Sequence, residues 1–367
     1  MEFFATAAFG LEGLVKRELQ QLGLDAKGET GGARFTATPA QAFSANLWLR
    51  TADRVLLIVG EKKVTSFEEL FQFVLSLPWE KYLPKNARFP VNGKCARSQL
   101  MSVRDCQAIT KKAIVERMKR HYKIQWFEEN GAEYPIDVSL HGDIARLTID
   151  TSGTALNRRG YRTWNGEAPI RETLAAALVM LSPFRDDTPL WDPCCGTGTL
   201  LIEAAMAAKG IAPGLKRTFS AMYWDSVPSE MWKEERQMAR EKQRDVEFFG
   251  RGGDIDSSVL SLVTDNAAKA GVGEFITAAQ ADLRDFVPEG DTGVVLCNPP
   301  YGERLLDVKA AEDLYRVMGK VFVPKAGWSY SIISPHEQFE QLFGRPADKR
   351  RKLYNGMLKC QLYMYYK

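Results

Sequence analysis

The sequence predicts an α/β fold with a mostly parallel, doubly wound sheet for its carboxyl-terminal part, preceded by smaller α+β units. Two motifs and one charge pattern support this prediction. The stretch 189–205 passes from an apolar strand through a glycine turn into an Ala-rich helix, and the apolar run 294–297 ends in Asn-Pro-Pro-Tyr. Residues 1–160 hold 23 Lys and Arg against 18 Asp and Glu, a net +5, whereas the remainder holds 26 against 28, a net −2. The opposite charges indicate that the two parts meet different partners.

The βα unit at 189–205 is typical of a nucleotide-like ligand held at a helix N-terminus, because Gly196 and Gly198 let the backbone approach that ligand closely. The third glycine of the dinucleotide fingerprint is absent. Asp192 stands just before the turn, and a carboxylate there suits a cationic ligand better than a pyrophosphate. S-adenosylmethionine, with its sulfonium and α-amino charges, fits this pattern. We expect Cys194 and Thr199 to contribute to the same cofactor site.

A second strand is expected over 246–250, followed by an acid placed to accept both ribose hydroxyls of the cofactor. Asp254 is the predicted acid, with Ile255 beside it. Asp256, two residues further on, is expected to cap the next helix instead.

A third strand, expected within 275–281, leads to Asp282 and Leu283. Asp282 can accept the adenine amino group, and Leu283 can cover the adenine ring. An acid at such a position is more commonly a cap or a solvated loop residue, so the prediction depends on the order of these acids along successive strands.

The tetrapeptide Asn298-Pro299-Pro300-Tyr301 suits the methylation of an exocyclic amine on a nucleobase. Such a nitrogen is a poor nucleophile until two acceptors hold its N–H groups, and the Asn298 side-chain oxygen and the Pro299 carbonyl can be those acceptors. Pro300 adds no donor, and Tyr301 offers a flat face for an extruded base. We expect Asn298 to approach the cofactor as well. The alternative is an ordinary turn that ends a strand.

The amino-terminal part alternates strands and helices and predicts two α+β units, residues 1–62 and 63–156. Its segment 81–123 holds 12 basic residues against two acids, a local +10 that indicates a polyanion partner. A solvated helix face explains some of this charge. The candidate RNA contacts in the segment are Lys94, Arg97, Arg104, Lys111 and Lys112.

A connector over 157–167 combines cations with aromatic side chains, a mixture that suits unpaired RNA. A plain linker is the alternative. Its candidate RNA contacts are Arg158, Arg159 and Arg162, interleaved with Tyr161 and Trp164.

These motifs resemble the bacterial 23S ribosomal RNA guanine-N2 methyltransferases that carry a THUMP domain. The pattern Asp-Pro-x-Cys-Gly-Ser/Thr-Gly-Thr-Leu-Leu-Ile-Glu-Ala-Ala of that family matches 192–205, and Asn-Pro-Pro-Tyr-Gly-Glu-Arg-Leu matches 298–305. The amino-terminal stretch 3–12 and the hairpin at 352–356 also resemble the corresponding segments of that family. Some family members continue into a second methyltransferase domain that this sequence does not contain, so functions of that domain are not carried over.

The resemblance implies a ferredoxin-like domain over 1–62, an RNA-docking THUMP domain over 63–156 and a Rossmann-like class I methyltransferase domain over 157–367 that ends in a reversed hairpin. It implies transfer of a methyl group from S-adenosylmethionine to guanosine N2, with 23S ribosomal RNA as the first substrate and transfer RNA as the second. It also places the helix from 169 onwards beside the methionine end of the cofactor, which makes Ile170 and Arg171 further candidates. The family uses the region 212–245 to shape the substrate side.

Other classes of function fit less well. The six cysteines and three histidines show no paired metal spacing, so no metal site is expected. No apolar run approaches the roughly 20 residues of a membrane span, and the start of the chain shows no basic leader, so we expect a cytoplasmic protein. The rivals that remain are adenine-N6 methylation of DNA and a non-catalytic RNA-binding or ribosome-assembly factor.

Overall fold

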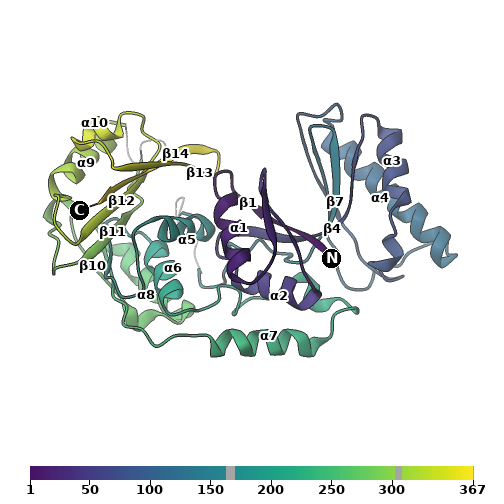
Figure 1. The fold of residues 1–367 in the computed structure, drawn as a ribbon, viewed down its shortest axis with the longest axis horizontal. Coiled ribbons are helices and arrows are strands. Elements are labelled where there is room, and N and C mark those ends of the chain that lie inside the picture. Colours follow the sequence, from purple (N-terminus) through teal and green to yellow (C-terminus); the bar gives the residue numbers. More distant parts are fainter. Residues whose placement is uncertain (163–169, 302–307, 367) are drawn as a thin grey trace.

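The computed structural model describes residues 1–162, 170–301 and 308–366. These residues form two seven-stranded sheets that lie beside each other along the long axis of the molecule, each covered by helices (Figure 1). No helix in the described ranges is both long enough and apolar enough to cross a membrane.

The amino-terminal sheet has the strand order β2-β3-β1-β4-β7-β6-β5. Its long central strand, β4, pairs antiparallel with β1 on one side and with β7 on the other, so the sheet continues through the boundary expected at 62/63. The elements of this half are β1 (Glu2–Ala7), α1 (Glu12–Gln21), β2 (Ala26–Glu29), β3 (Gly32–Thr36), α2 (Pro39–Trp48), β4 (Ala52–Lys63), α3 (Phe67–Ser76), the short 3-10 helix η1 (Trp79–Lys81), β5 (Val91–Ala96), α4 (Val103–Tyr122), β6 (Ile136–His141) and β7 (Ile144–Asp150).

The carboxyl-terminal sheet has the order β10-β9-β8-β11-β12-β14-β13, in which the first five strands are parallel and β14 pairs antiparallel with both β12 and β13. The predicted doubly wound sheet with a reversed terminal hairpin is confirmed. The elements are α5 (Glu172–Leu181), β8 (Leu190–Asp192), α6 (Thr199–Ala208), η2 (Ser220–Tyr223), α7 (Ser229–Glu241), β9 (Gly250–Asp254), η3 (Ser257–Val259), α8 (Leu260–Ala270), η4 (Gly273–Phe275), β10 (Ile276–Gln280), η5 (Leu283–Asp285), β11 (Gly293–Cys297), α9 (Val308–Val321), β12 (Trp328–Ser334), α10 (Phe339–Phe343), β13 (Lys349–Asn355) and β14 (Leu358–Tyr366).

One strand lies elsewhere than the sequence predicts. The strand expected over 246–250 occupies Gly250–Asp254, because its glycines accept close packing from the preceding turn and helix. A Cβ atom on Gly252 would lie 2.9 Å from Cys195 Sγ and 3.0 Å from Leu201 Cδ1.

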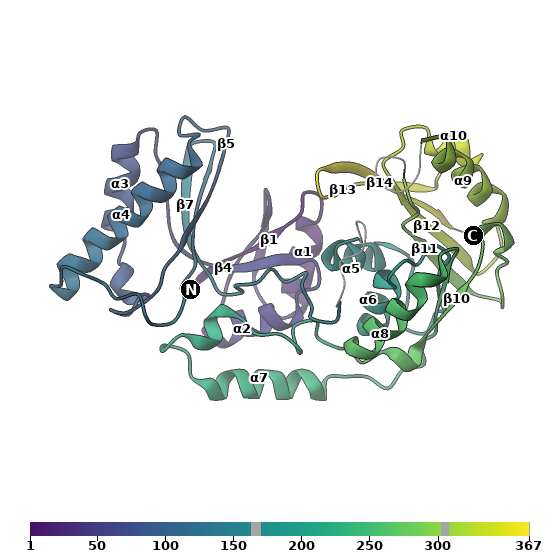
Figure 2. The same ribbon diagram turned by 180° about the vertical axis from the view of Figure 1, so that it is seen from behind.

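The segment between α6 and β9 packs against the amino-terminal half, not along the cofactor strands. Trp232 on α7 stacks on Phe43 of α2 with ring centroids 4.1 Å apart, and Trp224 stacks on Tyr134 at 4.7 Å. Figure 2 shows α7 running beneath α2. Phe219, Trp224 and Trp232 are thus buried in the core of the amino-terminal half, and the expectation that 212–245 shapes the substrate side stays a prediction.

Candidate active site

The site forms where the carboxyl ends of four parallel strands meet. The chain order reverses between β8 and β11, since β9 and β10 extend the sheet on one side of β8 and β11 and β12 extend it on the other. Ligands of open α/β sheets bind at such a switch point. Asp192 ends β8, Asp254 ends β9, Asp282 follows β10 by two residues, and Asn298 directly follows β11.

The glycine turn 193–198 links β8 to the N-terminus of α6. Gly196 and Gly198 have φ angles of +50° and +79°, which side-chain-bearing residues rarely adopt. A Cβ atom on Gly198 would also lie 2.9 Å from Val263 Cγ1 of α8. The backbone of this turn therefore requires glycine at both positions.

Asp254 braces this turn from the neighbouring strand. Its Oδ2 accepts from the Gly196 N–H at 2.8 Å, and its Oδ1 accepts from the Asp256 N–H at 3.0 Å. Asp256 in turn accepts from the Ser258 N–H and caps η3, the capping role predicted for it. Each Asp254 oxygen keeps a second lone pair for a ligand hydroxyl.

Asp192 is buried at the floor of the site. Its Oδ1 accepts from the Cys194 N–H at 3.2 Å, and the side chain is 1% exposed. Burial raises the pKa of Asp192 to about 8, an effect that the Cys194 hydrogen bond opposes and the nearby Asp254 carboxylate reinforces. At neutral pH this carboxyl is largely protonated until a cation approaches it.

Asp282 and Leu283 begin the short helix η5 at the side of the cavity. Asp282 accepts from the Arg284 N–H at 2.9 Å and forms an ion pair with the Arg284 guanidinium at 3.0 Å. Leu283 is 5% exposed and presents an apolar surface to the cavity.

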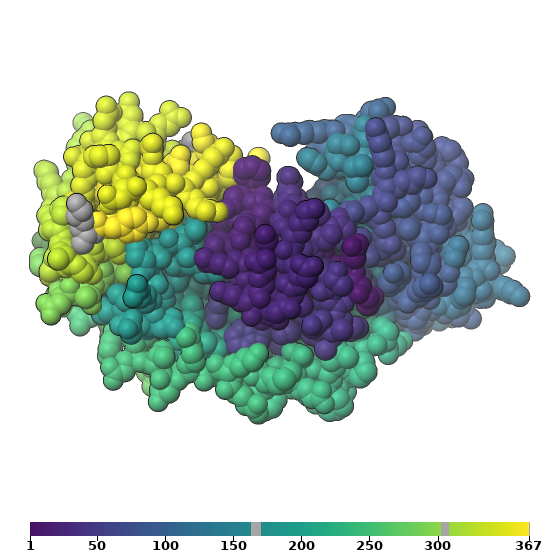
Figure 3. Space-filling model, in the orientation of Figure 1, coloured from purple at the N-terminus to yellow at the C-terminus, as the bar shows by residue number. Residues whose placement is uncertain are grey.

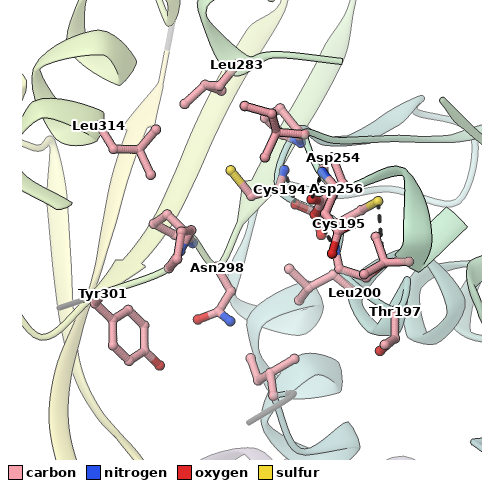
Figure 4. Close-up of a pocket in the computed structure, with 18 of the residues that line it drawn as sticks. Cys194, Cys195, Thr197, Leu200, Asp254, Asp256, Leu283, Asn298, Tyr301 and Leu314 are labelled. Atoms are coloured by element: carbon pink, nitrogen blue, oxygen red, sulfur yellow. Dashed lines mark hydrogen bonds between the residues drawn. The ribbon is translucent and has the colours of Figure 1, made fainter. Parts of the chain in front are cut away.

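Asn298 and Tyr301 project into the cavity from the opposite side, with Asn298 between Tyr301 and Leu200 in Figure 4. The Asn298 Oδ1 atom is buried and has no hydrogen-bond partner within the described part of the chain. The hydroxyl of Tyr301 accepts from Asn355 Nδ2, which lies at the tip of the β13–β14 hairpin. A donor brought to Asn298 would therefore meet an acceptor that no described residue satisfies.

One cavity of about 1310 Å³ collects these residues. Gly198 and Arg171 are the predicted cofactor residues that lie outside its lining, and Ile170 is part of it. Sequence reasoning missed the two hairpin residues in the lining, because strand pairing brings them there and no motif marks them. The predicted residues that line the cavity are Asp192, Cys194, Gly196, Thr199, Asp254, Ile255, Asp282, Leu283, Asn298, Pro299, Pro300 and Tyr301, and the lining residues that were not predicted include Asn355 and Leu358 of the hairpin.

Some of the candidate RNA-contacting side chains are exposed to solvent and others are partly buried. Lys94, Arg97, Arg104, Lys112 and Arg158 are exposed. Lys111 is half-buried, pairs with Glu129 at 2.7 Å and lies 3.5 Å from the centre of the Phe89 ring. Trp164 lies outside the described residues.

The prediction that Arg159 contacts RNA is wrong, because its side chain is buried. It is 3% exposed and donates to the backbone carbonyls of Leu156 and Arg50, with Glu203 at 3.4 Å. Arg162 is also largely enclosed, since it donates to Thr199 Oγ1 at 2.7 Å and to the Ile170 carbonyl. Arg159 and Arg162 thus hold the connector against α6. Arg158 is the arginine of the described connector that remains exposed.

Comparison with known proteins agrees with this architecture. The sequence matches the RMKL-like methyltransferase domain over residues 159–364, the RlmL ferredoxin-like domain over 2–56 and the THUMP domain over 64–150. The putative RNA methyltransferase YpsC of Bacillus subtilis is 43% identical over 99% of this chain and 95% of its own length. The ribosomal RNA large subunit methyltransferase K/L of Psychromonas ingrahamii is 33% identical over 100% of this chain, which spans 50% of that relative. The crystal structure of SMU.472, a putative methyltransferase complexed with SAH, has a TM-score of 0.94 and 44% identity, covering 100% of this chain and 97% of the other.

The fold and the site together define a class I methyltransferase, the class that takes its methyl group from S-adenosylmethionine. The parallel sheet, the glycine turn and the carboxylates at successive strand ends all belong to that class, and the predictions of fold and cofactor are confirmed. The chain belongs to the RMKL-like methyltransferase family, with a ferredoxin-like and a THUMP domain before the catalytic domain. Within the described residues, no cluster of three or more His, Cys, Asp or Glu side chains could hold a metal ion.

Proposed function

We propose that this protein transfers a methyl group from S-adenosylmethionine to the N2 amine of a guanosine in RNA, with large-subunit ribosomal RNA as the first choice of substrate. The observation that carries the proposal is the buried oxygen of Asn298 at the end of β11, for which the described residues provide no hydrogen-bond partner. A buried acceptor without a partner costs about 1–3 kcal/mol. An amine donor in the cavity removes that cost, and the Asn298 amide can turn towards it about the broad χ2 torsion.

The chemistry follows from what an aromatic amine lacks. Its lone pair is delocalised into the ring, and two acceptors that hold both N–H groups favour a tetrahedral, nucleophilic nitrogen. Asn298 Oδ1 and the Pro299 carbonyl are the proposed acceptors, and Tyr301, held by Asn355, is the proposed stacking surface. The amine proton leaves after transfer, when the nitrogen is cationic and acidic, so the step needs no histidine base.

The remaining cavity residues suit the methyl donor, which supplies an electrophilic methyl group on a sulfonium. Asp192 neutralises positive charge at the floor of the site, and Asp254 accepts ribose hydroxyls while it keeps the Gly196 turn in place. Asp282 and Leu283 are proposed to contact the adenine ring. The reaction is mainly one of positioning the amine nitrogen against the methyl group of the donor.

The RNA assignment is supported by the basic surface of the THUMP half and by the names of two relatives, one a putative RNA methyltransferase and one a ribosomal RNA methyltransferase. We propose that the exposed cations of that surface bind phosphates. They are Lys94, Arg97, Arg104 and Lys112.

Transfer of labelled methyl groups tests the proposal. The full-length protein is incubated with total RNA from cells that lack it, or with duplex DNA, and the nucleosides are separated. N2-methylguanosine in large-subunit ribosomal RNA supports the proposal, and the same product in transfer RNA revises the substrate. N6-methyladenine in DNA would refute the choice of base, and the absence of any methylated product would favour a non-catalytic binding factor.

A further inference from the structure

The β13–β14 hairpin has a strong excess of positive charge. Residues 349–367 contain six Lys and Arg and no Asp or Glu. Since β13 is an edge strand of the sheet, its cations can simply prevent edge-to-edge pairing. Three further features of this hairpin point to a ligand.

The first feature is the arrangement of side chains on one face. Side chains alternate along β13, so Leu353 faces the core at 0% exposure while Lys352 and Tyr354 face outwards. Tyr354 is directly opposite Lys359 on β14, and the Lys352 ammonium lies 5.5 Å from the Tyr354 ring centre. Two cations therefore flank one aromatic ring.

The second feature is a contribution from the other end of the chain. The loop between β1 and α1 reaches the hairpin, where Arg351 donates to the Gly10 carbonyl at 3.3 Å. Phe9 of that loop is 57% exposed and meets Tyr354 edge to face at 5.5 Å. Figure 3 shows the yellow carboxyl-terminal strands directly against the purple amino-terminal half.

The third feature is the position of the hairpin at the mouth of the active-site cavity. Asn355 and Leu358, on either side of the tight turn, line the cavity, and Asn355 holds the Tyr301 hydroxyl. Between them Met357 is 99% exposed. A nucleotide whose base enters the cavity must have its neighbours close to this turn.

We propose that this hairpin platform, formed by Phe9, Lys352, Tyr354, Met357 and Lys359, binds the RNA nucleotides that flank the target base. The inference rests on the proposed function and adds a second RNA contact beside the basic THUMP surface. The two ammonium groups bind phosphates, the aromatic pair stacks on unpaired bases, and Met357 packs into the stack that the extruded base leaves.

The test uses full-length protein carrying Lys352→Glu and Lys359→Glu, with Lys233→Glu and Lys320→Glu as a control of equal charge change on exposed residues of α7 and α9. Binding of a fluorescein-labelled, mixed-sequence 20-nucleotide single-stranded RNA is followed by anisotropy at several salt concentrations. We expect about tenfold weaker binding for the hairpin variant and a salt dependence shallower by about 1.4 in log–log slope, because two phosphate contacts are lost. Cofactor affinity should be unchanged in both variants, which also checks that they fold.

Met357→Ala is a second variant. It should fold normally, because the Met357 side chain is almost fully exposed to solvent. We expect it to slow methylation of total RNA about tenfold while binding of the 20-nucleotide RNA changes less than twofold. If wild type methylates RNA and both hairpin variants match the control, the hairpin inference is wrong and the proposed function stands. If wild type neither binds nor methylates RNA, the proposed function fails first. Loss of methylation on ribosomal particles alone, with free RNA unaffected, would assign the hairpin to a protein contact and overturn the inference.

Discussion

The buried oxygen of Asn298 predicts that activity and stability respond differently to the same substitution. Asn298→Ala removes the proposed amine acceptor and leaves the Pro299 carbonyl in place. It also removes a buried polar atom that has no partner within the described part of the chain. Most substitutions that damage an active site through misfolding lower stability and activity together.

The expected magnitudes follow from these two roles. Loss of one orienting acceptor lowers the rate of the chemical step by at least about a hundredfold, or about 2.7 kcal/mol. For folding, the relief of an unsatisfied acceptor is worth about 1–3 kcal/mol, and the small cavity left by the amide offsets part of it. We therefore expect the free energy of unfolding to stay within about 1 kcal/mol of wild type.

Single-turnover transfer of a labelled methyl group to total RNA measures the rate, and urea unfolding measures stability. Cofactor and RNA affinities should remain near wild type in Asn298→Ala. Gln341→Ala, which removes an exposed amide from α10, is the matched control for both measurements. Turnover of Asn298→Ala within threefold of the control would refute the acceptor role, and a loss of stability above about 3 kcal/mol would show that the oxygen is not free of partners.

Three further predictions concern the carboxylates. Asp254→Ala should weaken S-adenosylmethionine binding by about 1–3 kcal/mol, roughly 5- to 150-fold, in calorimetry, while Asp285→Ala, an exposed acid, changes nothing. The pKa of Asp192 is raised above its unfolded value to about 8, so this carboxyl stabilises the ligand-free fold at low pH and loses that contribution as pH rises from about 4 to 8. A bound cation lowers this pKa, so at pH 7 cofactor binding should release a proton, visible as a buffer-dependent enthalpy that Asp192→Asn abolishes. Glu203→Ala should cost about 3–5 kcal/mol in urea unfolding, because Arg159 stays buried without its partner, whereas Glu203→Gln, which keeps an acceptor, costs less.

The sequence predicts the cavity residues well because each follows the end of a strand in a fixed chain order. A short apolar run fixes where β8 and β11 end, and parallel strands bring their carboxyl ends to one edge of the sheet. Asp192 and Asn298 therefore line one cavity although they are 106 positions apart in the sequence. Their roles in binding and chemistry stay predictions that the experiments above address.

Residues that depend on tertiary pairing could not be predicted in this way. Asn355 reaches Tyr301 because β14 pairs antiparallel with β12, and no local pattern reveals that partner. Arg159 belongs to an Arg-rich connector whose composition predicts an exposed segment. In the structure its side chain is buried and forms an ion pair with Glu203 of α6. The aromatic residues Phe219, Trp224 and Trp232 lie between α6 and the end of α7, but their positions in the sequence do not tell which half of the protein they cover.

The same buried contacts make the two halves one body. Leu11 and Leu14 of the amino-terminal half lie in the core of the catalytic sheet, while Trp232 of the catalytic half lies in the amino-terminal core. Arg50, at the end of α2, donates to the carbonyls of Met206 and Ile211 beside α6. Removal of the first 150 residues would expose these apolar side chains and break these hydrogen bonds, so loss of activity in such a fragment would not isolate an RNA-docking role. Because large apolar interfaces resist domain motion, the THUMP surface lies at a fixed distance from the cavity. If RNA docks on the THUMP surface as proposed, it would have to present its docking element and its target base at that separation, and the frame would then favour structured substrates.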